Sequence, residues 1–207
     1  MTLTDTQRAQ IDRYVQDALE YNLKVNITSD DSTPLLRDRH IADGLAVVPT
    51  LRELFSGGTP SILDLGSGGG FIGMAIKIAW PEARVTLMEP LERKFRFLSA
   101  AAARLGLADL RVLRKSASEA RAAGLEHDLV VERALAELPQ AVEWAIPLTR
   151  AFGYFIAYQS APADGDFLKK SLAKAGARLV KSVPYQLPAD DRRRYFAVFQ
   201  REAKGEN

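Results

Sequence analysis

The stretch ILDLGSGGGFIGMAI, residues 62–76, joins a short apolar run to a glycine-rich loop and then to a segment of helical pattern. Glycines in such a loop permit a tight turn and let backbone amides reach a ligand at the helix N-terminus. Two glycine patterns overlap here, Gly66-x-Gly68-x-Gly70 and Gly68-x-Gly70-x-x-Gly73. Both predict a nucleotide-type cofactor, but the two patterns are typical of cofactors of opposite charge.

Two acidic residues help to choose between these cofactors. Glu89 ends the next predicted strand, 19 residues after Gly70, where a carboxylate can chelate both hydroxyls of a ribose. Asp64 lies at the tip of the first strand, and no lysine or arginine occurs between Pro60 and Ile76. A carboxylate there repels a pyrophosphate and attracts the ammonium and sulfonium of S-adenosylmethionine. The sequence therefore favours the methyl donor, although Asp64 as an Asx-turn residue and Glu89 as a solvated loop residue remain open.

The pattern around this loop predicts an α/β fold. Apolar runs at 61–65, 84–89, 110–113, 128–132 and 154–158 alternate with helical patterns at 71–80, 92–105, 116–123, 135–148 and 167–175. Such alternation is typical of a parallel sheet covered on both faces. Residues 177–185 and 193–200 then face each other with no helix between them, which indicates an antiparallel hairpin at one edge. We expect a class I methyltransferase fold, Rossmann-like, with a seven-stranded, mostly parallel sheet.

The first part of the chain has a different organisation. Thr4-x-x-Gln7 is a capping box that precedes apolar residues at helical spacing, and Thr33-Pro34 begins a second helical pattern. We therefore expect an N-terminal helical extension, residues 1–58, that packs on a methyltransferase domain, residues 59–207.

Composition limits the possible functions. The 207 residues, 47% hydrophobic and 26% charged, suit one globular domain with a short appendage and leave no room for a separate substrate domain. The absence of cysteine and the two isolated histidines, His40 and His127, argue against a metal site. No targeting or membrane-spanning segment is apparent, so we expect a soluble, cytoplasmic monomer. A net charge of +2 neither requires nor excludes a polyanionic partner.

Several motifs together resemble one family, the bacterial 16S ribosomal RNA guanine-N7 methyltransferases (RsmG, formerly glucose-inhibited division protein B). The similarity runs from about Tyr21 to Gln200. Its motifs are Asn26-Ile27-Thr28, Arg39-His40-Ile41-Ala42-Asp43, Asp64-Leu65-Gly66-Ser67-Gly68-Gly69-Gly70, Arg93-Lys94-Phe95-Arg96-Phe97-Leu98 and Arg133-Ala134-Leu135-Ala136. The glycine motif is shared by many methyltransferases, whereas Arg39-His40 and the later Arg-Ala-x-Ala are more specific together.

The candidates for donor binding come from both arguments. The loop and the two acids provide Asp64, Ser67, Gly68, Gly70 and Glu89. The resemblance implies that Gly66 and Phe71 touch S-adenosylmethionine, that Ala117 and Ser118 flank its adenine, and that Arg133 lines the pocket. Residues 117, 118 and 133 follow predicted strands at the carboxyl edge of the sheet, where ligands bind in such folds. A surface ion pair of Arg133 with Glu132 or Glu137 is the alternative.

The resemblance further implies that the substrate is a guanine in ribosomal RNA. Guanine N7 carries a lone pair and no proton, so its methylation needs alignment and no general base. The candidates for substrate positioning are Asn26, Arg39, His40, Asp43 and Arg133, with Asn26 as a simple turn residue the alternative. Further candidate RNA contacts are Arg37, Arg93, Lys94, Arg96 and residues 192–194, although each residue singly also fits a solvated face. Because the guanine must be splayed out, we expect an assembled or assembling small ribosomal subunit as the substrate.

Some positions depart from the family pattern. Phe71-Ile72 replaces a Leu-Pro pair, Glu132 replaces a serine, and Gln159-Ser160 replaces a Lys-Gly pair, which removes a cation expected near RNA. Trp80 and Trp144 lie in helical patterns and are predicted to be core residues. Three alternatives stay open: a methyltransferase of a small molecule or protein, a non-catalytic binding module, and an NAD-dependent oxidoreductase.

Overall fold

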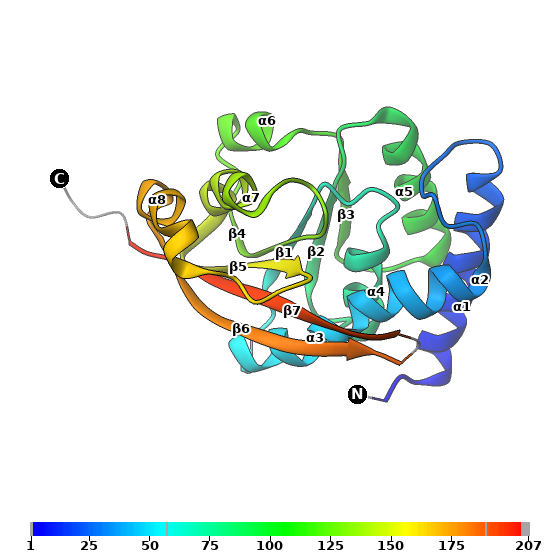
Figure 1. The fold of residues 1–207 in the computed structure, drawn as a ribbon. Coiled ribbons are helices and arrows are strands. Elements are labelled where there is room, and N and C mark those ends of the chain that lie inside the picture. Colours follow the sequence, from blue (N-terminus) through cyan, green and yellow to red (C-terminus); the bar gives the residue numbers. More distant parts are fainter. Residues whose placement is uncertain (1, 57, 189, 204–207) are drawn as a thin grey trace.

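A computed structural model describes residues 2–56, 58–188 and 190–203, and its fold is drawn in Figure 1. The sheet contains seven strands in the order β3-β2-β1-β4-β5-β7-β6. The strands are β1 (Ser61–Leu65), β2 (Arg84–Met88), β3 (Leu110–Leu113), β4 (His127–Glu132), β5 (Thr149–Gln159), β6 (Ala177–Leu187) and β7 (Asp190–Arg201). The first five are parallel, and β7 is antiparallel to both of its neighbours. The predicted sheet and its terminal hairpin are confirmed.

Helices cover both faces of this sheet (Figure 1). One hydrophobic cluster lies on the side of α4 (Phe71–Ala79) and α5 (Glu92–Leu105). The other lies beneath α6 (Ala117–Ala122), α7 (Leu138–Ala145), the short 3-10 turn η2 (Ile146–Leu148) and α8 (Gly165–Ala175). Burial on both faces explains why the parallel strands read as continuous apolar runs in the sequence.

The N-terminal segment forms α1 (Asp5–Asn22), α2 (Thr33–Leu35), a π-helical turn η1 (Leu36–Ile41) and α3 (Ala42–Leu54). The capping box of Thr4 and Gln7 is present, as predicted. Tyr14 and Val47 from this segment share one buried cluster with Ile62 and Ile76 of the sheet domain. The segment therefore contributes to the main core, and the boundary at residue 58 stays a prediction.

The helix predicted over 135–148 is shorter and begins later than expected. Ala134 has a left-handed backbone with φ of 57°, which breaks the helical path after β4. The helix α7 begins only at Leu138, with Pro139 in its first turn, and ends in the 3-10 turn. The extra loop between β4 and α7 lies at the carboxyl edge of the sheet.

None of the helices in the part of the chain that the structure describes is long and apolar enough to cross a membrane.

Candidate cofactor and substrate site

The glycine loop lies between β1 and α4, as the sequence predicts. Gly70 is the N-cap of α4 and has φ of 76°. A β-carbon there would clash with the side chain of Leu98 and lie 2.9 Å from the hydroxyl of Tyr14, so only glycine fits. The Tyr14 hydroxyl also donates a hydrogen bond to the carbonyl of Gly69. Helix α1 therefore braces the loop from behind.

Asp64 is more buried than the electrostatic argument assumed, with only 3% of its surface exposed. Its Oδ2 accepts the amide of Gly73 at 2.9 Å, in the first turn of α4. Burial raises the pKa of this carboxyl to about 6, although the hydrogen bond from Gly73 acts in the opposite direction. Asp64 thus holds the first turn of α4 in place, and its carboxyl group also lines the smaller of the two cavities described below.

Glu89 is not a solvated loop residue, because only 4% of its surface is exposed. Its Oε2 accepts the amide of Gly68 and its Oε1 accepts the amide of Leu91, both at 2.9 Å. Each carboxylate oxygen has a second lone pair that can accept a hydroxyl. The residue therefore fixes the glycine loop to the end of β2, and it does not itself line either of the cavities described below.

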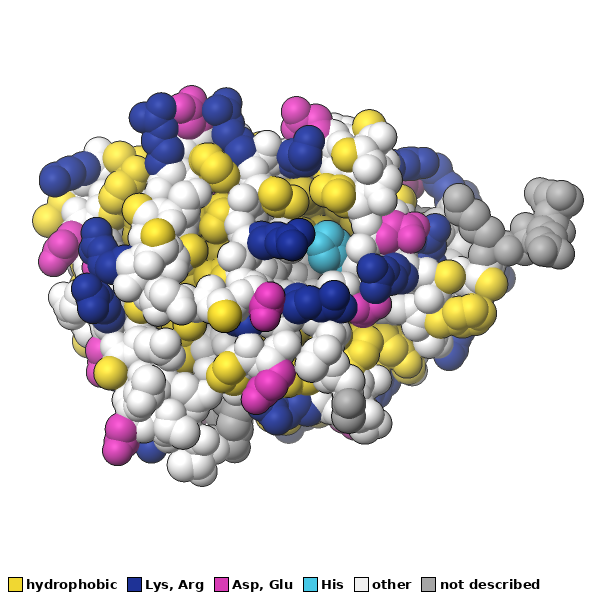
Figure 2. Space-filling model, turned by 180° about the vertical axis from the view of Figure 1, so that it is seen from behind, with side chains coloured by type: hydrophobic (Ala, Val, Ile, Leu, Met, Phe, Trp, Pro, Cys, Tyr) yellow, Lys and Arg dark blue, Asp and Glu magenta, His cyan; other side chains and the backbone are white. Residues whose placement is uncertain are grey.

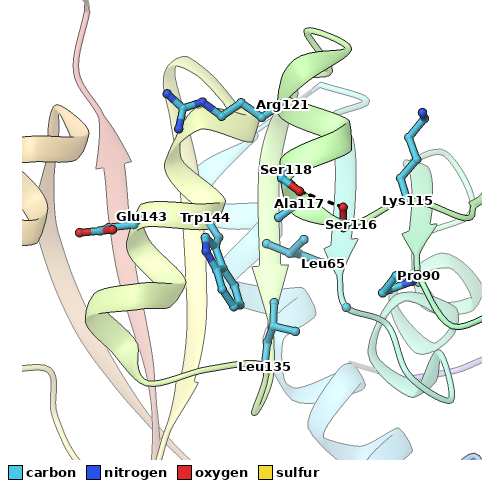
Figure 3. Close-up of a pocket in the computed structure, with 11 residues that line it drawn as sticks. Leu65, Pro90, Lys115, Ser116, Ala117, Ser118, Arg121, Leu135, Glu143 and Trp144 are labelled. Atoms are coloured by element: carbon cyan, nitrogen blue, oxygen red, sulfur yellow. Dashed lines mark hydrogen bonds between the residues drawn. The ribbon is translucent and has the colours of Figure 1, made fainter.

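The first of two cavities at this loop is largely apolar and has a volume of about 540 Å³. Figure 3 shows Trp144 of α7 pointing toward Leu65 and Leu135, with Ala117 and Ser118 at the start of α6 on the opposite side. Trp144 is 37% exposed, so its prediction as a core residue is wrong, whereas Trp80 is buried at 5%. The helical pattern placed Trp144 on a helix but could not show that the face it occupies borders a cavity.

The second cavity is smaller, about 210 Å³, and more polar. Both cavities include Gly66 in their walls. The lining of the second cavity also contains several of the predicted site residues: His40, Asp64, Ser67, Gly68, Phe71 and Arg133. An apolar chamber that meets a polar chamber with a buried carboxyl group at a glycine loop suits a ligand with an aromatic base at one end and a polar, charged group at the other.

One cation lies near the glycine loop in space although it is far from the loop in the sequence. Lys94 of α5 lines the second cavity, and its Nζ lies 4.0 Å from where a β-carbon of Gly68 would be. The absence of lysine and arginine from residues 60–76 therefore does not keep cations away from this loop in space. Asp64 is the carboxylate in the lining of the same cavity.

Arg133 connects the cavity to the N-terminal segment. Its Nη1 donates to Oδ2 of Asp43 at 2.7 Å, and its Nη2 donates to Nδ1 of His40. His40 also contacts Oδ2 of Asp30 through Nε2 at 2.8 Å and stacks on the ring of Phe71, with centroids 4.9 Å apart. Burial first, and Arg133 second, lower the pKa of His40, so the ring is neutral at pH 7 and can accept from the arginine. The alternative surface ion pair for Arg133 is wrong.

The π-helical turn η1 was not recognisable in the sequence. Such a turn inserts an extra residue into a helix and is frequent at functional sites. Here it carries Arg39 and His40, and Asp43 follows it in the first turn of α3. Asp43 is 2% exposed, and its Oδ1 accepts the hydroxyl of Tyr185 on β6 at 2.9 Å.

Some candidates are not part of the cavities. The side chain of Asn26 is exposed and absent from their linings, and Asn22 forms the turn in its place, with Oδ1 accepting the amides of Ile27 and Thr28 at 2.8 and 3.1 Å. Asparagine at both positions suits a turn, so the residue type alone could not separate them. Among the candidate RNA contacts, Arg37 pairs with Asp12 and Arg96 pairs with Glu92.

Glu132 is a site residue whose role the sequence did not reveal. It is 1% exposed, and burial raises the pKa of its carboxyl to about 7. Its Oε2 accepts the amide of Leu135 at 3.1 Å and so closes the turn that contains the left-handed Ala134. Leu135 in turn covers Gly66, where a β-carbon would lie only 2.6 Å from it. Glu132, a departure from the family pattern, therefore supports the turn that places Leu135 in the wall of the first cavity.

Within the described residues, no group of three or more acidic or histidine side chains is arranged to hold a metal ion.

The fold and the loop define a class I S-adenosylmethionine-dependent methyltransferase. The structure is similar to a SAM-dependent methyltransferase from Aquifex aeolicus, with a TM-score of 0.55 and 16% identity, covering 82% of this chain and 94% of that one. It is also similar to TYW2 of M. jannaschii, solved in complex with AdoMet, with a TM-score of 0.54 and 12% identity over 76% of this chain and 74% of that one. At these identities the likeness shows the fold.

Sequence comparison then identifies the family. Residues 7–186 match the model of the family GidB, described as rRNA small subunit methyltransferase G. The chain is 32% identical to ribosomal RNA small subunit methyltransferase G of Lactococcus lactis, over 92% of this chain and 82% of that protein. It is 31% identical to the protein of the same name from Myxococcus xanthus, over 93% and 88%. The chain belongs to this family, and its cofactor is S-adenosylmethionine.

Proposed function

We propose that this protein transfers a methyl group to N7 of a guanine in 16S ribosomal RNA, acting as a monomer on an assembled or assembling small ribosomal subunit. The observation that carries the choice of N7 is that His40 and Asp64, which line the second cavity, are already held by hydrogen bonds. His40 is held between Asp30 and Arg133, and Asp64 is held by the amide of Gly73. The hydrogen bonds that His40 and Asp64 already make favour a substrate atom that has no proton to lose, and N7 of guanine is such an atom.

The residues present fit the cofactor. S-adenosylmethionine supplies a methyl group on a positively charged sulfur. In this proposal the apolar cavity with Trp144, Ala117 and Ser118 holds the adenine, and Glu89 receives the ribose hydroxyls. Asp64 and the amides of the glycine loop hold the charged methionine end in the polar cavity. What supports this assignment is the apolar lining of the first cavity and the presence of Asp64 and the glycine loop in the lining of the second.

The protein's contribution to the chemistry is alignment and electrostatics. Methylation of N7 leaves a positive charge on the purine, which nearby carboxylates stabilise. Asp43 pairs with Arg133, and Asp30 holds His40, whose ring stacks on Phe71. A purine that reaches the second cavity would meet a neutral histidine and an arginine paired with Asp43, while the carboxyl group of Asp64 lines the same cavity as Lys94.

The direct test is transfer of labelled methyl groups by the purified protein. We expect incorporation into small ribosomal subunits that lack the modification, with loss at high salt, and little incorporation into metabolite pools or protein. Incorporation into a small molecule or a protein alone would refute the ribosomal substrate. A thermal-shift comparison adds a second arm: stabilisation by NAD but not by S-adenosylmethionine would refute methyl transfer.

A further inference from the structure

A third cavity, of about 430 Å³, adjoins the site, and no residue of the glycine loop lines it. It shares Arg133 with the second cavity and extends away from the glycine loop. Its walls come from η1, the start of α3, the end of β5 and the hairpin of β6 and β7, and its lining residues are Arg39, Asp43, Arg133, Tyr158, Gln159, Ser160, Tyr185, Arg192, Arg193 and Arg194. The three cavities therefore adjoin one another at the carboxyl edge of the sheet: Gly66 lines the first and the second, and Arg133 lines the second and the third.

The charge of the third cavity is strongly unbalanced. Among the lining residues, five arginines face a single carboxylate, that of Asp43. From outside the lining, Asp30 pairs with Arg39, and Asp190 pairs with Arg192 and Arg194. The carboxylate of Asp43 is already occupied, because Arg133 lies 2.7 Å from it, Arg194 lies 3.5 Å from it, and the Tyr185 hydroxyl donates to it. Asp43 therefore holds the inner wall together and leaves the outer arginines without a partner in the cavity lining.

The outer arginines, Arg192 and Arg193, lie on β7 and are exposed. Arg192 is 79% exposed and pairs with Asp190 at 3.1 Å. Such an exposed pair contributes little stability and can exchange its partner. Among the described residues no carboxylate lies within ion-pairing distance of Arg193, whose neighbour Arg194 takes both Asp190 and Asp43.

The floor of the cavity is polar but uncharged. The hydroxyl of Tyr158 donates to the backbone carbonyl of Asp43 at 3.3 Å, and the ring of Tyr185 stacks on Phe196 with centroids 4.0 Å apart. Burial raises the pKa of both tyrosines, so neither adds negative charge. A rim of arginines above neutral phenols is suited to an anion and unsuited to a cation.

The charge of the molecule as a whole does not produce this preference. On the face turned away in Figure 1, basic side chains are interspersed with acidic and hydrophobic ones (Figure 2), and the net charge is only +2. The arginine cavity is a local concentration of charge at one end of the cofactor site.

We propose that the arginine cavity binds a backbone phosphate of the RNA strand next to the target nucleotide, with Arg192 and Arg193 as the contacts. This inference rests on the RNA substrate of the proposed function. Arginine forks bind phosphate oxygens in pairs, and a concave site of this kind accepts an extruded or single-stranded nucleotide but not an intact A-form helix. With the phosphate held here, the base lies on the Arg133 side of the cavity, which opens toward the methyl donor.

The test compares the double variant R192Q/R193Q with the wild type and with R178Q. Arg178 is an exposed arginine at the other end of the same hairpin, where it bonds Gln200, so it serves as a matched control. Binding of a short single-stranded RNA to the protein saturated with S-adenosylhomocysteine is measured by fluorescence anisotropy over a range of salt concentrations. Inorganic phosphate is included as a competitor to separate RNA from a free anion.

We expect the double variant to bind the RNA at least tenfold more weakly, and its salt dependence to fall by about 0.7 in log–log slope for each phosphate that is no longer neutralised. R178Q should match the wild type, and affinity for S-adenosylhomocysteine should be equal in all three proteins.

Equal RNA affinity and equal slope in the double variant and the wild type would overturn the assignment, as would an equal loss of RNA affinity in R178Q. A third result would assign the cavity to a free anion and overturn the proposal. In that case inorganic phosphate would compete at concentrations too low to screen charges, while R192Q/R193Q would bind the RNA as the wild type does. Methylation of ribosomal subunits by the wild type is measured separately, so failure of the cavity and failure of the proposed function give different results.

Discussion

The guanidinium of Arg133 lies 2.7 Å from the carboxylate of Asp43, which is ninety positions earlier in the chain. The pair joins the end of β4 to the first turn of α3, and the same guanidinium also reaches His40. Asp43 is buried, so an arginine that leaves it would strand a charge inside the protein. The N-terminal segment and the sheet domain are therefore tied together at Arg133, which lines both the second and the third cavity.

Replacing Arg133 by lysine tests this connection. Lysine is a single point charge and cannot bond Asp43 and His40 with the fork of an arginine. Loss of one such hydrogen bond costs about 1.5–3 kcal/mol, so we expect kcat/KM for subunit methylation to fall about 10- to 100-fold. The measurement is steady-state kinetics beside a denaturation curve, and a variant with wild-type kcat/KM would show that the bridge is not needed.

Asp64 provides a prediction for the cofactor. In D64N the side-chain oxygen can still accept the amide of Gly73, but the negative charge is lost. We expect affinity for S-adenosylmethionine to fall more than affinity for S-adenosylhomocysteine, whose sulfur is uncharged. Titration calorimetry with both ligands measures the difference. An equal change for the two ligands would contradict a charge role for this carboxyl.

Although D64N should bind the cofactor more weakly, we expect the same variant to make the cofactor-free protein more stable at alkaline pH. The pKa of Asp64 rises from 3.8 to about 6 on folding, so the folded state binds the proton more tightly than the unfolded state. The free energy of unfolding therefore decreases as pH rises between these two values, by up to about 3 kcal/mol. D64N lacks this loss, and we expect it to be more stable than the wild type at pH 8 and equal to it below pH 4. Denaturant titrations across this range decide the point.

Glu132 can be tested by a pair of substitutions. In E132Q the side chain would keep an acceptor for the amide of Leu135, whereas E132L would leave that amide without a partner, at a cost of about 1–3 kcal/mol. We expect E132Q to bind the cofactor as the wild type does and E132L to bind it about tenfold more weakly, because Leu135 covers Gly66. Normal cofactor binding by E132L would remove this glutamate from the site.

Trp144 offers a direct optical readout of the apolar cavity. It is the more exposed of the two tryptophans, and Figure 3 shows its ring in the cavity wall beside Leu135. Stacking of an adenine on the indole should quench its fluorescence when S-adenosylhomocysteine is added. We expect the quenching to persist in W80F and to disappear in W144F. Quenching of equal size in W144F would place the adenine elsewhere.

The sequence predicted those features that depend on local periodicity and on backbone chemistry. The strands around Asp64, the glycine loop and the hairpin of β6 and β7 are confirmed because apolar runs, positive φ values and turn spacing are local properties. The capping box at Thr4 belongs to the same group.

Features that depend on contacts between distant segments were less accessible. The sequence could not show that Asp64 is buried, that Lys94 approaches the glycine loop, or that Trp144 borders a cavity, because each outcome depends on which helix packs against which face. The π-helical turn and the left-handed Ala134 were equally hidden, since their residue types favour ordinary helix. Such departures from local preference concentrate at the site, as expected where function opposes local propensity.

The most direct test of the central claim is the chemical identity of the product. Small-subunit ribosomal RNA from cells with and without this protein is reduced with borohydride and treated with aniline, which cleaves the strand at N7-methylguanine. The account predicts one cleavage that depends on the protein and is restored by the purified enzyme with S-adenosylmethionine. Identical cleavage patterns in the two RNAs, or methyl incorporation without a new aniline-sensitive guanine, would contradict it.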